Sequence, residues 1–297
     1  MTLGSTTGAT ARAARWNGAP GTYPQWYEDP LSCLQTTLGS ILLEHGLKPV
    51  EVLGLACEFA FAPDDVPREE FYRPVQSDRG VAADLCRHHD VESAWTTGRD
   101  ADDLIELIET HSSVIVAVDN YHLPFRPAFH DVHAAHLVVV PAWRRTPDGA
   151  VEFYVSDAQP PAFQGWLAAE HLVNSWTSGN PSDTQDVFFS SSEIGGRVLT
   201  TRVRSQREEL TDRQVMPALR DNLDRWTTGT AGAADRVWTG RAGLARFVER
   251  LQESSADPAD LRSAYTFGWA MHAQAFLHGP YPQEFAQRSK QDRQLGE

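Results

Sequence analysis

A chain of 297 residues is long enough to bury a substantial core in one large or two modest domains. Its formal net charge of −14 disfavours nucleic acid and anionic membranes as partners, because phosphate groups bind to local positive charge. The longest apolar runs have strand length, far below the ~20 residues that cross a bilayer. The three cysteines show no CxxC spacing, which argues against a disulfide framework and a thiolate zinc site.

The chain divides into three parts by composition and periodicity. Residues 1–24 are small, polar and rich in Gly and Thr, and they lack the apolar centre of a secretory signal, so we expect a flexible leader on a cytoplasmic protein. Helical and strand patterns are mixed over residues 25–207, which indicates an α+β domain. Amphipathic helical patterns alone follow, which predicts a helical C-terminal domain over residues 208–297.

The first predicted helix has both of its ends marked in the sequence. Ser32 is a good N-cap, and Gly46 provides a C-terminal stop. Between them, apolar residues recur at helical spacing at Leu34, Leu38, Ile41 and Leu42. This assignment puts Cys33 in the first helical turn.

An antiparallel meander is predicted downstream. The segment "ADDLIELIETHSSVIVAVD" reads as a helix followed by a strand that ends at Asp119. His136 opens a second strand over residues 136–143, and the turn "RRTPDGA" reverses it into a third strand that ends at Asp157. The basic stretch over residues 197–207 is interpreted as a solvated strand and linker. Helices are predicted over residues 211–226, 240–252 and 258–277.

Three residues of this pattern offer the chemistry of nucleophilic catalysis. A thiol at the start of a helix has its reactive thiolate form favoured by the helix dipole, which describes Cys33. A nearby histidine takes and returns a proton, and a carboxylate holds the imidazole in the useful tautomer. If the second and third strands are antiparallel neighbours, His136 and Asp157 lie at the same edge of the sheet. The order Cys, His, Asp resembles the papain-like cysteine peptidase arrangement.

A closer resemblance is to the family of the N-terminal domain of butirosin biosynthesis protein H. Five elements occur in the order found in that family, over roughly residues 28–180. They read "SCLQTTLGSILLEHG", "VLGLACEFAF", "VDNYHLPF", "HAAHLVVV" and "FYVSDAQPP". One departure follows the histidine strand, where many relatives read Gly-Tyr-Asp and this chain reads Pro141-Ala142-Trp143.

This resemblance implies a papain-like fold and a cysteine acyltransferase of natural-product biosynthesis. The acyl donor would be a thioester on an acyl or peptidyl carrier protein, and a small-molecule amine or another nucleophile would be the acceptor. Cys33 would be the nucleophile, His136 the base and Asp157 its orienting acid. No cofactor is expected beyond the phosphopantetheine thioester of the donor. A thioesterase or peptidase with the same triad, and a non-catalytic scaffold in which Cys33 is a core residue, are the alternatives.

Several residues have secondary or competing interpretations. Gln25 is a candidate oxyanion donor, together with the backbone N–H of Cys33. His133 is a second candidate for the base, and Asp119 for its orienting acid or for a residue that fixes the following loop. His130 and His133, together with Asp119 or Asp131, also raise the alternative of a metal site, which we do not adopt. An acidic enzyme needs a basic surface to dock an acidic carrier protein, and the candidates are Arg144, Arg145, Arg202 and Arg204.

Overall fold

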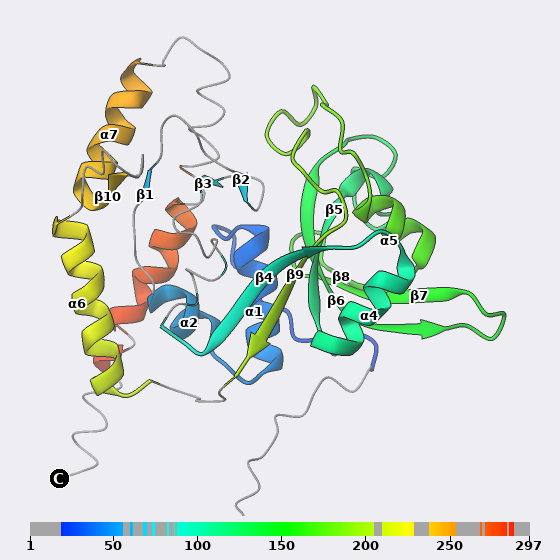
Figure 1. Ribbon diagram of the computed structural model, residues 1–297, viewed down its shortest axis with the longest axis horizontal. Coiled ribbons are helices and arrows are strands. Elements are labelled where there is room, and N and C mark those ends of the chain that lie inside the picture. The colour runs from blue at the N-terminus through cyan, green and yellow to red at the C-terminus, as the bar shows by residue number, and fades with distance from the viewer. Residues whose placement is uncertain are drawn as a thin grey trace, which may run out of the picture.

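The computed structural model describes residues 19–55, 60–61, 68–69, 73–74, 82, 86, 88–204, 210–228, 238–253, 268, 271–283 and 285–287. Its centre is a six-stranded sheet in which every neighbouring pair of strands is antiparallel (Figure 1). The strand order is β4 (Val91–Thr97), β9 (Arg197–Val203), β5 (Val114–Asp119), β6 (Ala135–Arg145), β7 (Val151–Asp157) and β8 (Phe163–Ala168). The predicted α+β class with an antiparallel sheet is confirmed.

Helices cover both faces of this sheet. Helix α1 (Cys33–Glu44) packs on one face, and helices α4 (Ala101–His111) and α5 (Ala169–Trp176) pack on the other. The central strand β5 is buried along its whole length, which explains its continuous apolar sequence VIVAVD. Alternate residues of β5 enter the two cores, with Ile115 and Ala117 toward α1 and Val116 and Val118 toward the opposite helices.

Helix α1 follows its sequence signals closely. Ser32 is the N-cap, and its side chain accepts a hydrogen bond from the backbone N–H of Gln35. The helix ends before Gly46, which adopts a φ of 74° that favours glycine. At Gly39 a Cβ atom would lie 1.9 Å from the Trp26 ring, so only glycine lets this indole pack directly on the helix. These features fix the helix that carries Cys33 at its first position.

The departure from the family pattern lies inside β6. Strand β6 shows a register shift against β7 between Val139 and Ala142, and Pro141 lies inside the shifted part. A proline lacks the N–H that a regular ladder uses, so a bulge accommodates it. The departure at Pro141 therefore changes the middle of a strand.

Two expectations from the sequence need correction. The basic stretch from Arg197 is not a solvated strand, because β9 lies between β4 and β5 and buries its residues 198–201. The predicted leader over residues 1–24 also includes residues that are packed on the sheet. Tyr23 is buried, its backbone N–H donates to Gln164, and the N–H of Gly21 donates to the Tyr154 hydroxyl. Residues 21–23 are therefore bound to β7 and β8.

The described residues after residue 208 are mostly helical, with the short strand β10 (Trp238–Thr239) between two of the helices. Helix α6 (Asp212–Thr228) and helix α7 (Gly240–Glu253) match two of the predicted helices, and residue 268 and residues 271–277 of the third are helical. Helix α2 (Pro49–Leu55) shares a core with this part, formed by Leu55, Leu210, Val215, Ala218, Tyr281 and Phe285. The domain boundary at residue 208 stays a prediction.

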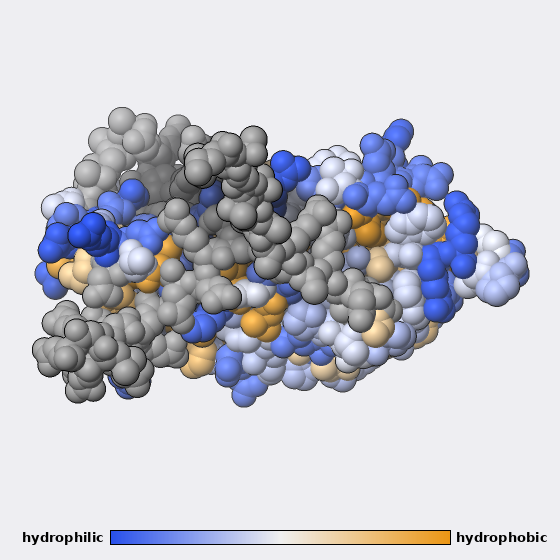
Figure 2. Space-filling model, turned by 90° about the horizontal axis from the view of Figure 1, so that it is seen from below, coloured by the Kyte–Doolittle hydropathy of each residue, from blue (hydrophilic) through white to orange (hydrophobic). Residues whose placement is uncertain are grey.

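Short elements complete the structure. Strand β1 (Ala60–Phe61) pairs with β10 (Trp238–Thr239), and β2 (Arg68–Glu69) pairs with β3 (Arg73–Pro74). The 3-10 turn η1 (Asn120–His122) follows β5. The described face in Figure 2 is mostly hydrophilic with separate apolar patches, as the composition leads one to expect. Among the described residues, no helix combines the length and apolar character needed to span a membrane.

Candidate active site

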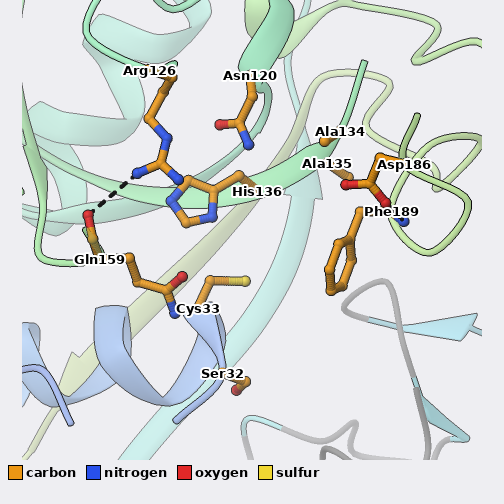
Figure 3. Close-up of a pocket in the computed structure, with 10 residues that line it drawn as sticks. All are labelled: Ser32, Cys33, Asn120, Arg126, Ala134, Ala135, His136, Gln159, Asp186 and Phe189. Atoms are coloured by element: carbon orange, nitrogen blue, oxygen red, sulfur yellow. Dashed lines mark hydrogen bonds between the residues drawn. The ribbon is translucent and has the colours of Figure 1, made fainter. Parts of the chain in front are cut away.

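A cavity of about 210 Å³ lies where α1 begins and β6 starts. One part of its wall is polar, and Phe189 with two alanines forms an apolar part (Figure 3). The residues that line it are Ser32, Cys33, Asn120, Arg126, Ala134, Ala135, His136, Gln159, Asp186 and Phe189. Cys33 and His136 of the predicted site thus face one cavity.

Cys33 occupies the first position of α1, directly after the N-cap Ser32. Cys33 is 8% exposed and borders the cavity. The first N–H groups of a helix have no partner within the helix, and the positive end of the helix dipole lies there. Both features stabilise negative charge on the sulfur or on a substrate oxygen bound next to it.

His136 and Asp157 are brought together by the strand pairing of β6 and β7, as the sequence predicts. The distance from His136 Nε2 to Asp157 Oδ2 is 2.9 Å, and both side chains are almost completely buried. With Nε2 directed at Asp157, the other ring nitrogen of His136 is available to Cys33, which lines the same cavity and contributes to the raised pKa of His136. Cys33 and the His136–Asp157 pair therefore meet at one cavity.

The pKa of His136 is strongly affected by these neighbours. Burial alone would lower it, but the negative charge and hydrogen bond of Asp157, together with the hydrogen bond and charge of Cys33, raise the pKa to about 9. His136 is therefore an imidazolium at neutral pH.

Two polar residues that the sequence analysis missed complete this network. Arg126 Nη1 donates to Asp157 Oδ2 at 3.1 Å and to the carbonyl oxygen of Gln159 at 3.3 Å. The backbone N–H of Gln159 donates to Asp157 Oδ1, so both carboxylate oxygens of Asp157 are bound. Figure 3 shows the Gln159 side chain extending toward the start of α1, and its Nε2 lies 3.4 Å from the carbonyl oxygen of Leu31.

A signal for both residues was present in the sequence. Arg126 directly follows the element "VDNYHLPF", and Gln159 belongs to "FYVSDAQPP". Neither residue type is diagnostic in a loop, however, and no strand or helix periodicity constrains their direction. Asn120, also in the cavity wall, has a buried Oδ1 with no hydrogen-bond partner among the described residues.

The predicted oxyanion role of Gln25 is corrected by its position. Its Nε2 donates to Ser156 Oγ at 3.1 Å and to the carbonyl oxygens of Asp157 and Phe163 at 3.0 Å each. An amide nitrogen carries only two hydrogens, and these protein acceptors use them. Gln25 joins the N-terminal segment to β7 and β8 and does not line the cavity.

The secondary candidates His133 and Asp119 pair with each other. His133 Nδ1 lies 2.7 Å from Asp119 Oδ2, and the His133 ring stacks on Tyr121 at a centroid distance of 4.1 Å. The Asp119 carboxylate also accepts hydrogen bonds from the backbone of Tyr121 and Ala134 and from Ser178 Oγ. Asp119 therefore fixes the loop between β5 and β6, and it does not orient His136.

The four arginines expected to dock a carrier protein lie far from the cavity. Arg144 and Arg145 end β6 and His136 is near its start, so eight residues, or roughly 25 Å, separate Arg144 from His136. Arg202 and Arg204 lie at the same far end, because Thr200 pairs with Val114 at the start of β5. This placement does not support the predicted docking role.

Two of these arginines form ion pairs with glutamates of the protein itself. The Arg144 guanidinium binds Glu152, with Nε 2.7 Å from Oε2, and lies over the Trp166 ring. Arg204 pairs with Glu92 at 2.7 Å.

Cys86 and the histidine-rich loop do not form a second reactive site among the described residues. Cys86 is fully buried, and burial raises its pKa to about 12, as suits a core residue. Cys57 lies outside the described residues. In the part of the chain that the structure describes, no group of three or more His, Cys, Asp or Glu side chains is arranged to hold a metal ion.

Comparison with known proteins identifies a family for part of the chain. Residues 32–158 match the family described as butirosin biosynthesis protein H, N-terminal. This segment belongs to that family. The segment shared with the butirosin biosynthesis protein H family begins at Ser32 and ends at Ala158, so it contains Cys33, His136 and Asp157. No curated protein matches the chain.

Proposed function

We propose that the protein is a cysteine-dependent acyltransferase of natural-product biosynthesis. It would take an acyl group from a carrier-protein thioester, hold it on Cys33 and pass it to an amine or another nucleophile. The observation that carries this proposal is that Cys33 and the hydrogen-bonded His136–Asp157 pair meet at one cavity. Membership of residues 32–158 in the butirosin biosynthesis protein H family supports a role in antibiotic biosynthesis. The resemblance of the Cys, His, Asp order to papain-like enzymes supports the same chemistry.

In the first step, the Cys33 thiolate attacks the carbonyl carbon of the donor thioester. The tetrahedral intermediate then expels the thiolate of the donor arm, and the His136 imidazolium gives that sulfur its proton. The products are a Cys33 thioester, a free donor thiol and a neutral His136. Exchange of one thioester for another is nearly balanced in energy, so the protein has chiefly to position the groups and stabilise one oxyanion.

In the second step, the acceptor amine attacks the Cys33 thioester. Neutral His136 removes a proton from the attacking nitrogen, the carbon–sulfur bond breaks, and Cys33 returns to its thiolate form. Asp157 keeps the imidazole oriented throughout and stabilises its positive charge. Arg126, bound to Asp157 and to the loop of Gln159, holds the carboxylate in place.

The oxyanion of both steps is best served by Gln159 and by the backbone N–H of Cys33. The Gln159 carboxamide borders the cavity and reaches the start of α1, whereas Gln25 is used elsewhere. A side-chain amide and a helix N-terminal N–H converging on one oxygen make an oxyanion site of ordinary composition. Figure 3 shows Gln159 and His136 on the side of the cavity that also holds Cys33.

The donor needs no cofactor held by the protein. A phosphopantetheine thioester is part of the carrier-protein substrate and brings its own acyl group. The cavity of about 210 Å³, with the Phe189 ring in its wall, suits a small acyl group.

The test is intact-protein mass spectrometry after brief incubation with pantetheine-type acyl thioesters and with loaded carrier proteins. We expect a mass gain equal to the acyl group in the native protein and none in Cys33→Ala. Addition of amines should then remove the adduct and yield an amide. Loss of the adduct to water alone would identify a thioesterase. If no thioester gives an adduct, and Cys33 reacts with iodoacetamide no faster than a model thiol, the protein is a scaffold and the proposal is wrong.

A further inference from the structure

A buried chain of hydrogen bonds joins the C-terminal helical residues to the turn that carries Cys33. Gln274 Nε2 donates to the carbonyl oxygen of Leu53 at 2.9 Å, and Gln274 Oε1 accepts from Gln35 Nε2 at 3.2 Å. Gln35 Oε1 in turn accepts from the backbone N–H of Ser32 at 3.1 Å and from its hydroxyl at 2.9 Å. The two glutamines are about 95% buried, so water does not replace these partners.

The backbone groups at the two ends of this hydrogen-bond chain determine which way each glutamine amide is oriented. The carbonyl of Leu53 only accepts, so the nitrogen of the Gln274 amide faces it and the oxygen faces Gln35. Gln35 must then present its nitrogen to Gln274 and its oxygen to the Ser32 N–H, which only donates. One arrangement of both amides satisfies these described partners, and it is the arrangement that caps α1.

The chain of hydrogen bonds ends at Ser32, the residue directly before the proposed nucleophile. Ser32 is the N-cap of α1, immediately precedes Cys33 and lines the same cavity. The capping box between Ser32 and Gln35 sets the direction in which the first helical N–H groups point. These groups include the backbone N–H of Cys33 that the proposed mechanism uses.

The C-terminal helical residues are held close to α2 at the other end. A Cβ atom on Gly54 would lie 2.7 Å from the carbonyl oxygen of Leu277, so the two backbones approach within a distance that only glycine permits. His278 Nδ1 lies 2.8 Å from the carbonyl oxygen of Gly54. In Figure 1 these residues form the orange-to-red helix beside α2. Gln274 lies on this helix, so a shift of the helix relative to α2 would move Gln274 as well.

We propose that Gln274 is a positioning residue of the active site, acting through Gln35 and Ser32 on Cys33. The C-terminal helical residues thereby complete the catalytic unit. This inference rests on the proposed function in one respect, namely that Cys33 is the reactive nucleophile.

The test uses Gln274→Met, which keeps the size of the side chain and removes the hydrogen bonds to Leu53 and Gln35. We expect kcat for Cys33 acylation to fall about tenfold with KM for the thioester unchanged, because a small displacement of a reacting group is costly. The rate of Cys33 alkylation by iodoacetamide, followed at the peptide level, should fall in parallel. Gln274→Asn, which keeps the amide on a shorter stem, serves if Gln274→Met does not fold.

His278→Leu is the matched control. It removes a hydrogen bond between the same helix and α2 but none of the chain to Ser32, so it should lower thermal stability and leave the alkylation rate of Cys33 unchanged. The double variant Gln35→Met/Gln274→Met should be no slower than Gln35→Met alone, since both substitutions break one path.

The two proposals fail in distinguishable ways. A native Cys33 that reacts like a model thiol contradicts the proposed function. A reactive native Cys33 with an equal rate in Gln274→Met contradicts the positioning role alone. Equal losses in Gln274→Met and His278→Leu also contradict it, because they would show that only the packing of the helix matters.

Discussion

Among the described residues, His133 and His136 lie three positions apart and each pairs with an aspartate, but of the two only His136 lines the cavity that contains Cys33. The pairs His136–Asp157 and His133–Asp119 have similar nitrogen–oxygen distances, 2.9 Å and 2.7 Å. The first pair is buried, and its His136 lines the same cavity as Cys33. In the second pair the imidazole is 23% exposed and stacks on Tyr121. The third partner, and not the pair, distinguishes a catalytic arrangement from a structural one.

The hydrogen-bond partners of the two carboxylates, Asp119 and Asp157, also differ. Asp119 accepts two backbone N–H groups that close its own loop, so its charge is used for local structure. Asp157 binds Arg126 and the backbone of Gln159, both of which line the cavity. The second pair therefore supports the wall of the site, whereas the first belongs to the site itself.

The comparison is tested most strongly by removing each imidazole. His136→Ala should lower the rate of Cys33 acylation roughly a thousandfold, because it removes the proton donor of the leaving thiol. His133→Ala, the matched control, should change that rate by less than about threefold and mainly lower the thermal midpoint. Burst kinetics of acyl-enzyme formation measures both. Equal losses in the two variants would show that the pairs are not functionally distinct.

A second comparison involves two glutamines, Gln159 in the cavity wall and Gln25 outside it. Gln159→Leu should lower the acylation rate about a hundredfold, as expected for loss of one oxyanion donor. Gln25→Leu leaves several buried acceptors without a donor, so it should lower the free energy of unfolding by about 1–3 kcal/mol with little effect on the rate. Denaturant unfolding and single-turnover kinetics separate the two effects. The opposite pattern would return the oxyanion role to Gln25.

Much of the fold was accessible from local sequence signals. The N-cap Ser32 and the stop Gly46 marked α1 within a few residues, and the turn at residues 144–150 marked the hairpin that brings β6 and β7 together. The position of β9 was not accessible, because its arginines look like a solvated strand. Pairing with strands about 85 and 105 residues earlier in the chain decides its burial.

The site was predictable where strand pairing determines it. His136 and Asp157 meet because neighbouring antiparallel strands start and end at one edge, a rule that needs no loop geometry. Arg126 and Gln159 come from loops, whose side-chain directions follow from no periodicity. Gln35 and Gln274 are 239 residues apart, and nothing local in the sequence links them.

The pH dependence follows from the pKa of His136. Its value of about 9 in the folded protein exceeds the ordinary 6.5, so its protonation stabilises the fold fully below pH 6.5. This contribution is lost as the pH rises through 9. The acylation rate should fall over the same range, because neutral His136 cannot protonate the leaving thiol.

The central claim, that Cys33, His136 and Asp157 act as one unit, is tested most directly by an NMR titration of the His136 ring in ¹⁵N-histidine-labelled protein. We predict that His136 is protonated at pH 7.5 and loses its proton near pH 9. Cys33→Ala and Asp157→Asn should each move this transition to lower pH. A His136 that titrates at or below 6.5, and that does not respond to Cys33→Ala, would contradict the account.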